Sequence, residues 1–228
     1  MRNMMRGVLV LTLAAGLSAC AKPEMASRST APEVTLASAG GGKPGSGIQT
    51  VNVPLNVVDV KVIVPRDLKV SEAETFYPLA DIVWRGDPRG NRYEQIEAIY
   101  ATAIPPAIAP LNHGIPVVAV IEVTRFHCVT DKTRYTVGGV HSLRFELTIR
   151  HAETGAILSG PRKVVADAPA PGGQKAVAQD MAGITQKHVV TERLATVIRR
   201  ELKTLNVDPA LLGLPASQSA FNPVAITE

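Results

Sequence analysis

The chain has 228 residues, of which 46% are hydrophobic and only 4% are aromatic, so it supports one ordinary domain with a core of Val, Ile, Leu and Ala. The formal net charge is +4, but Arg2 and Arg6 belong to a predicted export signal, and the chain without them carries +2. No basic stripe interleaved with aromatic residues is visible, which argues against a nucleic-acid-binding protein.

The first predicted element is a signal peptide over residues 1–19. An apolar run over residues 7–16 follows two arginines, and it is shorter than the roughly 20 residues that a helix needs to cross a bilayer. The sequence LSAC at residues 17–20 then resembles the lipobox of bacterial lipoproteins. The resemblance implies cleavage before Cys20, diacylglycerol on its thiol and usually acylation of the new amine. The alternative is an ordinary secretory signal with a chance cysteine.

The expected anchor is the lipid on Cys20. Two or more acyl chains hold a protein stably on a membrane, because each buried CH2 contributes about 0.8 kcal/mol. The next residue is Ala21, whereas an aspartate there retains lipoproteins of enteric bacteria in the inner membrane. Its absence resembles the outer-membrane default, so we expect anchoring on the periplasmic face of the outer membrane, with the inner membrane as the alternative. Residues 20–50, rich in Ala, Ser, Thr, Pro and Gly, are expected to be a flexible linker.

The first half of the folded domain is predicted to contain two strands and a helix. Enrichment in Val and Ile predicts a strand over residues 56–64, and a second, short strand is predicted over residues 81–84. Apolar side chains then recur at the spacing of one buried helix face. They are Ile96, Ile99, Tyr100, Ala103 and Ile104. Pro105 and Pro106 are expected to end or kink this helix.

The second half is predicted to contain three strands and a longer helix. The apolar start of residues 116–126 predicts a strand that is buried on both faces. Residues 142–150 alternate between apolar and polar, which predicts one face on the core and one in water. A return strand over residues 156–166 and a Pro/Gly loop over residues 167–173 follow. An amphipathic helix is expected over residues 184–205, with an apolar stripe of Val190, Leu194, Val197, Ile198, Leu202 and Leu205.

The order β-β-α-β-β-β-α predicts an α+β fold, with an antiparallel sheet of about four or five strands packed by two main helices. The single periplasmic domain is expected to span residues 51–214, and residues 215–228 are expected to be a C-terminal tail. This order is similar to that of small periplasmic domains such as the amino-terminal domain of TolB. A likeness of fold does not transfer function.

No catalytic or metal-binding constellation stands out, and no cofactor is expected. None of the five histidines lies at zinc-ligand spacing; they are His113, His127, His141, His151 and His188. Ser159 has no nucleophile elbow around it. Because Cys20 would carry lipid, Cys128 has no disulfide partner and is interpreted as a small buried apolar residue.

The most distinctive segment is residues 77–92, which contains the only tryptophan and a turn before the first helix. One interpretation is a structural corner in which Trp84 is buried and Asp87 caps the helix. The other is a partner surface, because Trp and Arg dominate interface hot spots. Its members would be Trp84, Arg85, Asp87, Arg89 and Arg92.

The segment 77–92, the segment 137–158 and the lipobox together resemble an uncharacterised family of alphaproteobacterial lipoproteins with a domain of unknown function. The resemblance covers most of the chain after the linker and implies no activity, ligand or catalytic residue. We therefore expect a non-enzymatic accessory lipoprotein that binds another envelope component, such as a transport or surface-assembly machine. A binding module for a small molecule, lipid or glycan between sheet and helix is the alternative. A hydrolase that uses Ser159 or the histidines is the weakest hypothesis.

Overall fold

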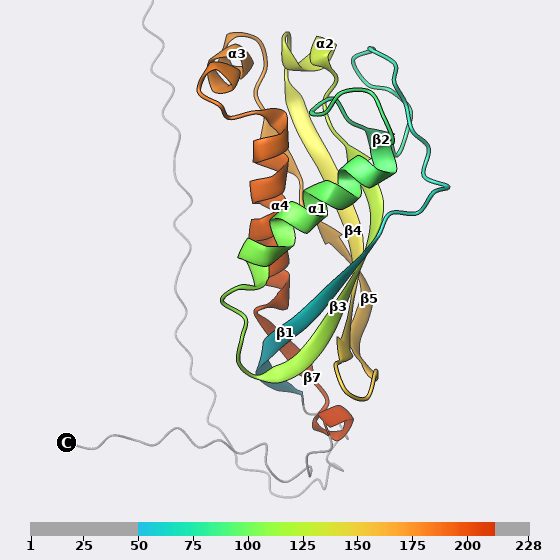
Figure 1. Cartoon of the computed structure of the whole chain (residues 1–228), viewed down its shortest axis with the longest axis vertical. Helices are drawn as coiled ribbons and strands as arrows, with labels where there is room; N and C mark the ends of the chain where they lie inside the picture. Colours follow the sequence, from blue (N-terminus) through green and yellow to red (C-terminus); the bar gives the residue numbers. More distant parts are fainter. Residues whose placement is uncertain (1–49, 213–228) are drawn as a thin grey trace, which may run out of the picture. The chain divides into compact units, whose positions relative to one another are not determined.

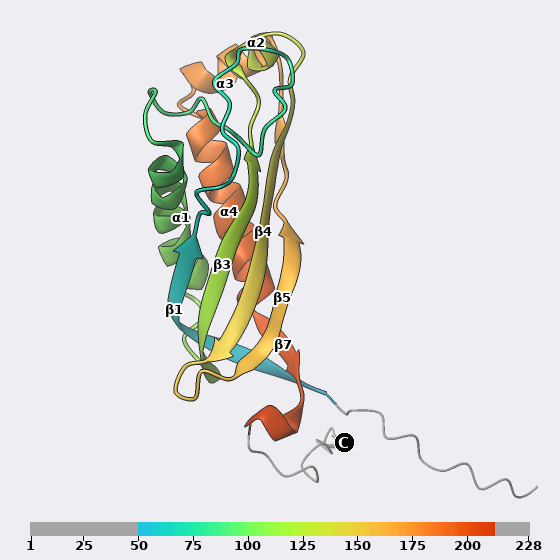
Figure 2. The ribbon, with the colours of Figure 1, turned by 90° about the vertical axis from the view of Figure 1, so that its right-hand side faces the viewer.

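The computed structural model describes residues 50–212. The predicted signal peptide, Cys20, nearly all of the linker and the predicted tail over residues 215–228 lie outside the described residues. Figures 1 and 2 show a sheet with the helices α1 and α4 on one of its faces. The elements are β1 (Val51–Ile63), β2 (Ile82–Val83), α1 (Arg92–Ile108), β3 (Ile115–His127), α2 (Asp131–Arg134), β4 (Gly139–His151), β5 (Ile157–Val165), β6 (Ala168–Ala170), α3 (Gln174–Met181), α4 (Gln186–Leu202), β7 (Thr204–Val207) and the 3-10 helix η1 (Pro209–Leu212).

The sheet is mixed, which corrects the prediction of an antiparallel sheet with four or five strands. Its seven strands are arranged in the order β5-β4-β3-β1-β7, with β2 paired to β3 and β6 paired to β4. β1 and β2 both run parallel to β3, whereas the other pairs are antiparallel. The parallel pair arises because α1 carries the chain back to the starting end of β1 before β3 begins. The sheet curves until it is nearly barrel-shaped.

The core lies between the helices and the inner face of the sheet. The predicted face of α1 is confirmed, because Ile96, Ile99 and Tyr100 are fully buried. The predicted alternation of β4 is also confirmed: Leu143 and Ile149 face the core, whereas the intervening side chains are exposed or half-buried. None of the described helices is both long and apolar enough to cross a membrane.

Two expectations fail and one helix was not predicted, because local sequence patterns do not show the tertiary arrangement. Only one face of the sheet carries helices, so the outward-facing Val118 and Val120 of β3 are half-buried, not fully buried. The second main helix ends at Leu202, and Leu205 fills the core from β7 instead. The short α3 was missed because Ala176 is its one buried residue, so its sequence carries no periodic apolar face.

Pro105 and Pro106 lie inside α1 and do not end it, since the helix continues to Ile108. Each proline removes one N–H donor from the helical ladder. The carbonyl groups that lose their donors belong to Ala101 and Thr102, which lie on the exposed side of the helix and remain open to water. Water can therefore bind these two carbonyl groups, and neither is left buried without a partner.

His141 is an unusual member of the core. Its side chain points inward from β4 and is fully buried, yet neither ring nitrogen has a hydrogen-bond partner. Burial lowers the pKa of His141 to about 4, and the positive charge of Arg134 contributes to the same shift. The ring is therefore neutral at physiological pH.

The proline interpretation is tested by two substitutions in α1. We expect Pro106→Ala to change the free energy of unfolding by less than about 1 kcal/mol, because the restored hydrogen bond is offset by a more flexible unfolded chain. Ala103→Pro should lower the same quantity by about 3 kcal/mol or more, since it removes a donor from the carbonyl of the buried Ile99. Urea denaturation measures both values. Equal effects would show that the exposure of the carbonyl is irrelevant.

The buried histidine makes a prediction about pH. Because the pKa of His141 is about 4 in the folded state and about 6.5 in an unfolded chain, the unfolded state binds the extra proton first as the pH falls. Stability should be fully present above about pH 6.5 and should fall by roughly 3 kcal/mol as the pH approaches 4. The variant His141→Leu should lack this component in urea titrations across the range. Parallel curves for the two proteins would contradict the assignment.

Candidate functional site

The candidate site lies where β3 and β4 separate. Their ladder runs from Val117 opposite His151 to His127 opposite Ser142, and there it stops. The backbone N–H of the next residue, Cys128, still donates to the carbonyl of Val83 at 2.8 Å, on the side of β2. The residue after it, Val129, would face β4 in a continued strand, but its carbonyl accepts from Nε2 of Gln186 in α4 at 3.1 Å. The divergence leaves a pocket of about 410 Å3 between the two chains.

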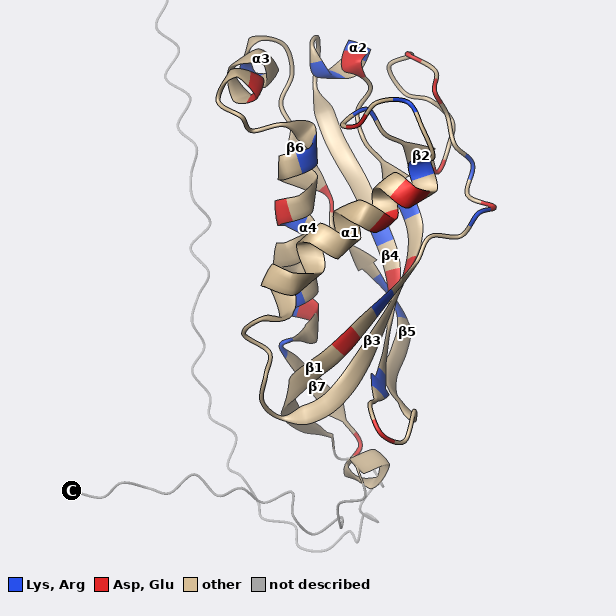
Figure 3. Ribbon diagram, in the orientation of Figure 1, with Lys and Arg blue, Asp and Glu red and all other residues tan. Residues whose placement is uncertain are grey.

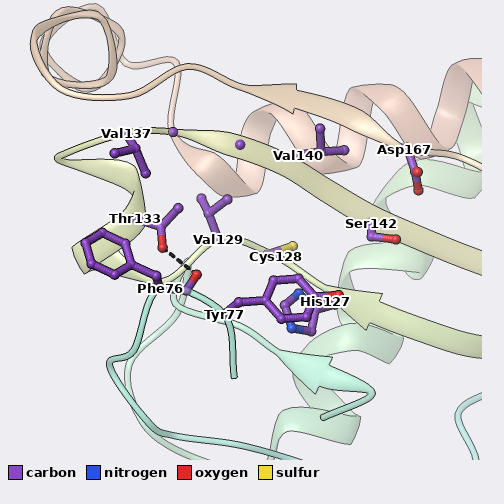
Figure 4. A pocket seen from close by; sticks show the side chains of 12 residues that line it. Phe76, Tyr77, His127, Cys128, Val129, Thr133, Val137, Val140, Ser142 and Asp167 are labelled. Atoms are coloured by element: carbon purple, nitrogen blue, oxygen red, sulfur yellow. Dashed lines mark hydrogen bonds between the residues drawn. The ribbon is translucent and has the colours of Figure 1, made fainter. Parts of the chain in front are cut away.

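Figure 4 shows the pocket from close by. Its walls are mainly apolar and include Tyr77, Val129, Val137 and Val140. The part of the lining next to the β3–β4 ladder is polar and includes Ser142 and Asp167. Val140 projects from the same side of β4 as Ser142, so the pocket opens on the face of β4 that is opposite to the helices.

Three hydrogen bonds hold residues 75–78 against the pocket. The hydroxyl of Thr130 donates to the carbonyl of Thr75 at 2.9 Å, and the hydroxyl of Thr133 donates to the carbonyl of Phe76 at 2.7 Å. The Nε2 atom of the buried His127 lies 2.9 Å from the carbonyl oxygen of Pro78, which can only accept, so this nitrogen carries the proton. The wall of the pocket is therefore fixed before any ligand arrives.

The ring of Tyr77 extends this fixed wall. It packs against the ring of His127 with the two centroids 4.5 Å apart. The contact orients Tyr77 along the mouth of the pocket, although 62% of the residue remains exposed. His127 therefore acts as a support for an exposed aromatic side chain.

Large apolar side chains at the pocket and beside it in the chain face solvent. We call this group the apolar rim; Phe76, Tyr77, Val137 and Val140 line the pocket, and Leu79 follows two residues after Tyr77, outside the lining. The five residues are between 51% and 82% exposed. The rim lies at the end of the domain that carries α2 and α3. The first strand starts at the other end, where Val51 pairs with Val207 of β7.

The pocket brings together a serine, a histidine and an aspartate, which are the residue types of hydrolase triads, but hydrogen bonds do not link the three side chains. Ser142 lies directly opposite His127 on the ladder, and Asp167 is nearby. The Oδ1 atom of Asp167 accepts from the backbone N–H of Leu143 at 2.9 Å, and Nε2 of His127 is bonded to Pro78. No hydrogen bond joins the serine to either group within residues 50–212.

Cys128 is fully buried beside the pocket. Burial raises the pKa of its thiol well above the usual range, which keeps the sulfur protonated. Its interpretation as a small buried apolar residue is confirmed.

The remaining histidines and Ser159 do not converge on one place. His113 is exposed in the connection between α1 and β3, His188 is exposed on α4, and His151 ends β4. Ser159 lies on β5 opposite Ile149. In the part of the chain that the structure describes, no three His, Cys, Asp or Glu side chains are grouped so that they could hold a metal ion.

The residues proposed as a partner surface are mostly internal. Trp84 is fully buried, and its indole N–H donates to Oδ2 of Asp87 at 2.8 Å. Lys187 of α4 binds the other oxygen of Asp87 at 2.8 Å. Burial raises the pKa of Asp87, but the hydrogen bonds from Lys187 and Trp84 outweigh it and hold the pKa below its usual value. Asp87 thus joins the corner to α4, whereas Asn91 caps α1.

The arginines of this segment are paired with acidic residues. Arg92 is 3% exposed and binds Glu72 with a shortest distance of 2.7 Å, while Arg85 contacts Glu72 and Glu74. The hydrogen bond from Arg92 lowers the pKa of Glu72. Figure 3 shows the two charge types interleaved along the connection from β1 to α1. These contacts support the structural-corner interpretation, and among the five proposed residues only Arg89 is exposed.

Sequence reasoning missed the apolar rim. The signal that could have revealed it is the run Phe76-Tyr77-Pro78-Leu79, which places three large apolar residues in a segment with no helical or strand period. Such residues either anchor a loop or face a partner. The structure shows that the backbone of this run is bonded to α2 and β3 while its side chains face solvent.

Comparison with known proteins gives a family and one distant structure. Residues 55–212 match the family of unknown function DUF6778. A search of the curated proteins found no match. The crystal structure of protein XCC0632 from Xanthomonas campestris, assigned to DUF330, is similar with a TM-score of 0.39 and 10% identity, over 65% of this chain and 81% of that one. The family match spans more than half of the sequence and confirms the likeness to an uncharacterised family: the chain belongs to the family of unknown function DUF6778.

Proposed function

We propose that this protein is a membrane-tethered accessory lipoprotein whose domain binds another cell-envelope protein through the apolar rim and the pocket within it. The observation that carries the proposal is the exposure of the rim, where Leu79 is 82% and Val137 is 73% exposed. Contiguous exposed apolar groups around a pocket are typical of protein interaction sites, because water is released when a partner covers them.

The rigidity of the rim supports the same conclusion. Binding costs free energy when loops and side chains must be ordered, and a wall that is already ordered avoids much of that cost. Here the backbone that carries Phe76 is bonded to Thr133, and the ring of Tyr77 is stacked on His127. Tyrosine is also among the residues that contribute most to protein interfaces.

The proposed anchor suits this arrangement. Lipid on Cys20 would hold the chain on the periplasmic face of the outer membrane, and the linker to Val51 would have a root-mean-square span of roughly 30 Å. Val51 lies at one end of the domain and the rim at the other. A tether attached at Val51 therefore leaves the rim free to meet a partner.

A second candidate function is the binding of a small molecule, lipid or glycan. The pocket favours it by its size, since about 410 Å3 falls within the usual range of ligand sites, and by its apolar walls. A smaller pocket of about 280 Å3 lies between sheet and helices and is lined by Leu55, Leu111 and Arg199. Arg199 already donates to the carbonyl of Pro106 there, at 2.6 Å.

The protein-partner hypothesis is tested by photo-crosslinking in the cell. A benzophenone side chain at Val137 should give a discrete protein adduct, whereas the same group at Arg144, an exposed site farther along β4, should not. The substitution Leu79→Ser should reduce the Val137 adduct severalfold while changing stability by less than about 0.5 kcal/mol, because the side chain is exposed. Identical adduct patterns at Val137 and Arg144, or none, would argue against the proposal.

The anchor is tested separately. Wild-type protein should incorporate labelled palmitate and sediment with membranes, and Cys20→Ala should lose both properties because it has no thiol to accept diacylglycerol. Cys128→Ala is the matched control, since its thiol is buried, and it should behave like the wild type. Palmitate labelling of Cys20→Ala at the wild-type level would rule out lipidation at this cysteine.

A further inference from the structure

The edge of β4 that borders the pocket lacks a partner strand among the described residues. On its other side, β4 pairs with β6, in the register Gly139–Ala170, Val140–Pro169 and His141–Ala168. Toward β3, the last register pair is His127 with Ser142. Three residues of β4, 139–141, therefore continue past the end of β3 with an open edge.

The direction of the backbone groups on this edge follows from the ladder. In an antiparallel strand, the N–H and C=O of successive residues point to alternate sides. Leu143 bonds toward β6, since its N–H donates to Asp167 and its carbonyl accepts from Ala166. Residues 139 and 141 share that direction, so the N–H and C=O of Val140 point toward the pocket. The register partner of Val140 in β6 is Pro169, which has no N–H to offer.

The chain that would have continued β3 is occupied elsewhere. Val129 is the next residue of β3 that would face β4, and its carbonyl accepts instead from Nε2 of the buried Gln186 at 3.1 Å. Thr130 then caps α2. The pocket thus occupies the place beside Val140 where the next residues of β3 would lie in an uninterrupted sheet.

We propose that the partner contributes an extended peptide segment that binds beside Val140 as an added strand, in the place that β3 leaves. This inference rests on the proposed function and specifies the chemistry of the partner. An extended peptide offers the N–H and C=O groups that match those of Val140. An acyl chain would fill the apolar volume but leave both groups of Val140 without a partner, at a cost in free energy.

The side chains around the edge suit such a segment. In an extended peptide, alternate side chains point to opposite faces. One set would enter the pocket beside Val129 and Thr133, and the other would face solvent. Phe76 and Val137 flank the mouth and would contact the apolar members of the segment. We therefore expect a short partner sequence in which apolar residues alternate.

The test uses the lipidated wild-type protein reconstituted in phosphatidylcholine vesicles. Random nonapeptides are selected for binding to it, and the affinity of labelled peptides is measured by fluorescence anisotropy. We expect Val140→Pro, which removes the N–H but spares the bonds to β6, to weaken binding about tenfold or more. Val140→Thr, which keeps the N–H, should stay within about threefold of the wild type. Leu79→Ser and Val137→Ser together should abolish selection at the rim.

N-methylation of the peptide backbone gives an independent readout that does not depend on the folding of Val140→Pro. A methyl group on the one peptide residue that pairs with Val140 should destroy binding, whereas methyl groups on its two neighbours should not, because their N–H groups point away from β4. The proposal is wrong if Val140→Pro binds the unmethylated peptide as tightly as the wild type does, and if every N-methyl peptide binds the wild type as tightly as the unmethylated peptide does. In that case no strand is added beside Val140, although binding at the rim stands. If no peptide depends on Leu79 and Val137, the proposed function fails as well. If peptides bind only after residues 213–228 are removed, the chain's own tail is the occupant and the proposal is wrong.

Discussion

The arrangement of the sheet and the position of the pocket both depend on the strand β3. This strand bonds to β1 and β2 along one edge and to β4 along the other, so it joins the two halves of the sheet. Its inward side chains, Val117, Ala119, Ile121 and Val123, are fully buried under the helices. The end of β3 also decides where the candidate site lies. After His127, Val129 bonds to Gln186 of α4, so β4 continues without a neighbour on this edge, and the pocket opens there.

Helices and strands that are long enough to show a repeating pattern of apolar residues could be predicted from the sequence. The buried face of α1 and the alternation of β4 extend over many residues, so each was recognised with its correct inward side. β2, β6 and β7 have two, three and four residues, which is too short to show any alternation. The direction of β3 relative to β1 depends on the path of α1, which is a property of the whole chain. Whether Pro105 and Pro106 end the helix depends on the exposure of the neighbouring carbonyl groups, which is also a tertiary property.

The site was not predictable for the same reason. The proximity of His127 and Ser142 is set by the register of β3 against β4, and the two are far apart in the chain. Tryptophan and arginine are frequent in protein interfaces, but here they make contacts within the domain. Trp84 is buried, and Arg85 and Arg92 are paired with acidic residues. Side chains that look suited to binding can serve the fold, whereas the rim is formed by residues such as Leu79 and Val137, which belong to no periodic pattern in the sequence.

The placement of Val51 and the rim at opposite ends of the domain has a mechanical consequence. The long strands β1, β3 and β4 run lengthwise between these ends (Figures 1 and 2). If the chain is tethered through Cys20 and the rim is held by a partner, any tension between them acts along the strands. The parallel ladder from Leu55 opposite Ile115 to Ile63 opposite Glu122 then bears the tension in shear. Its hydrogen bonds would then stretch together and not open one after another, which would make the domain resist such pulling.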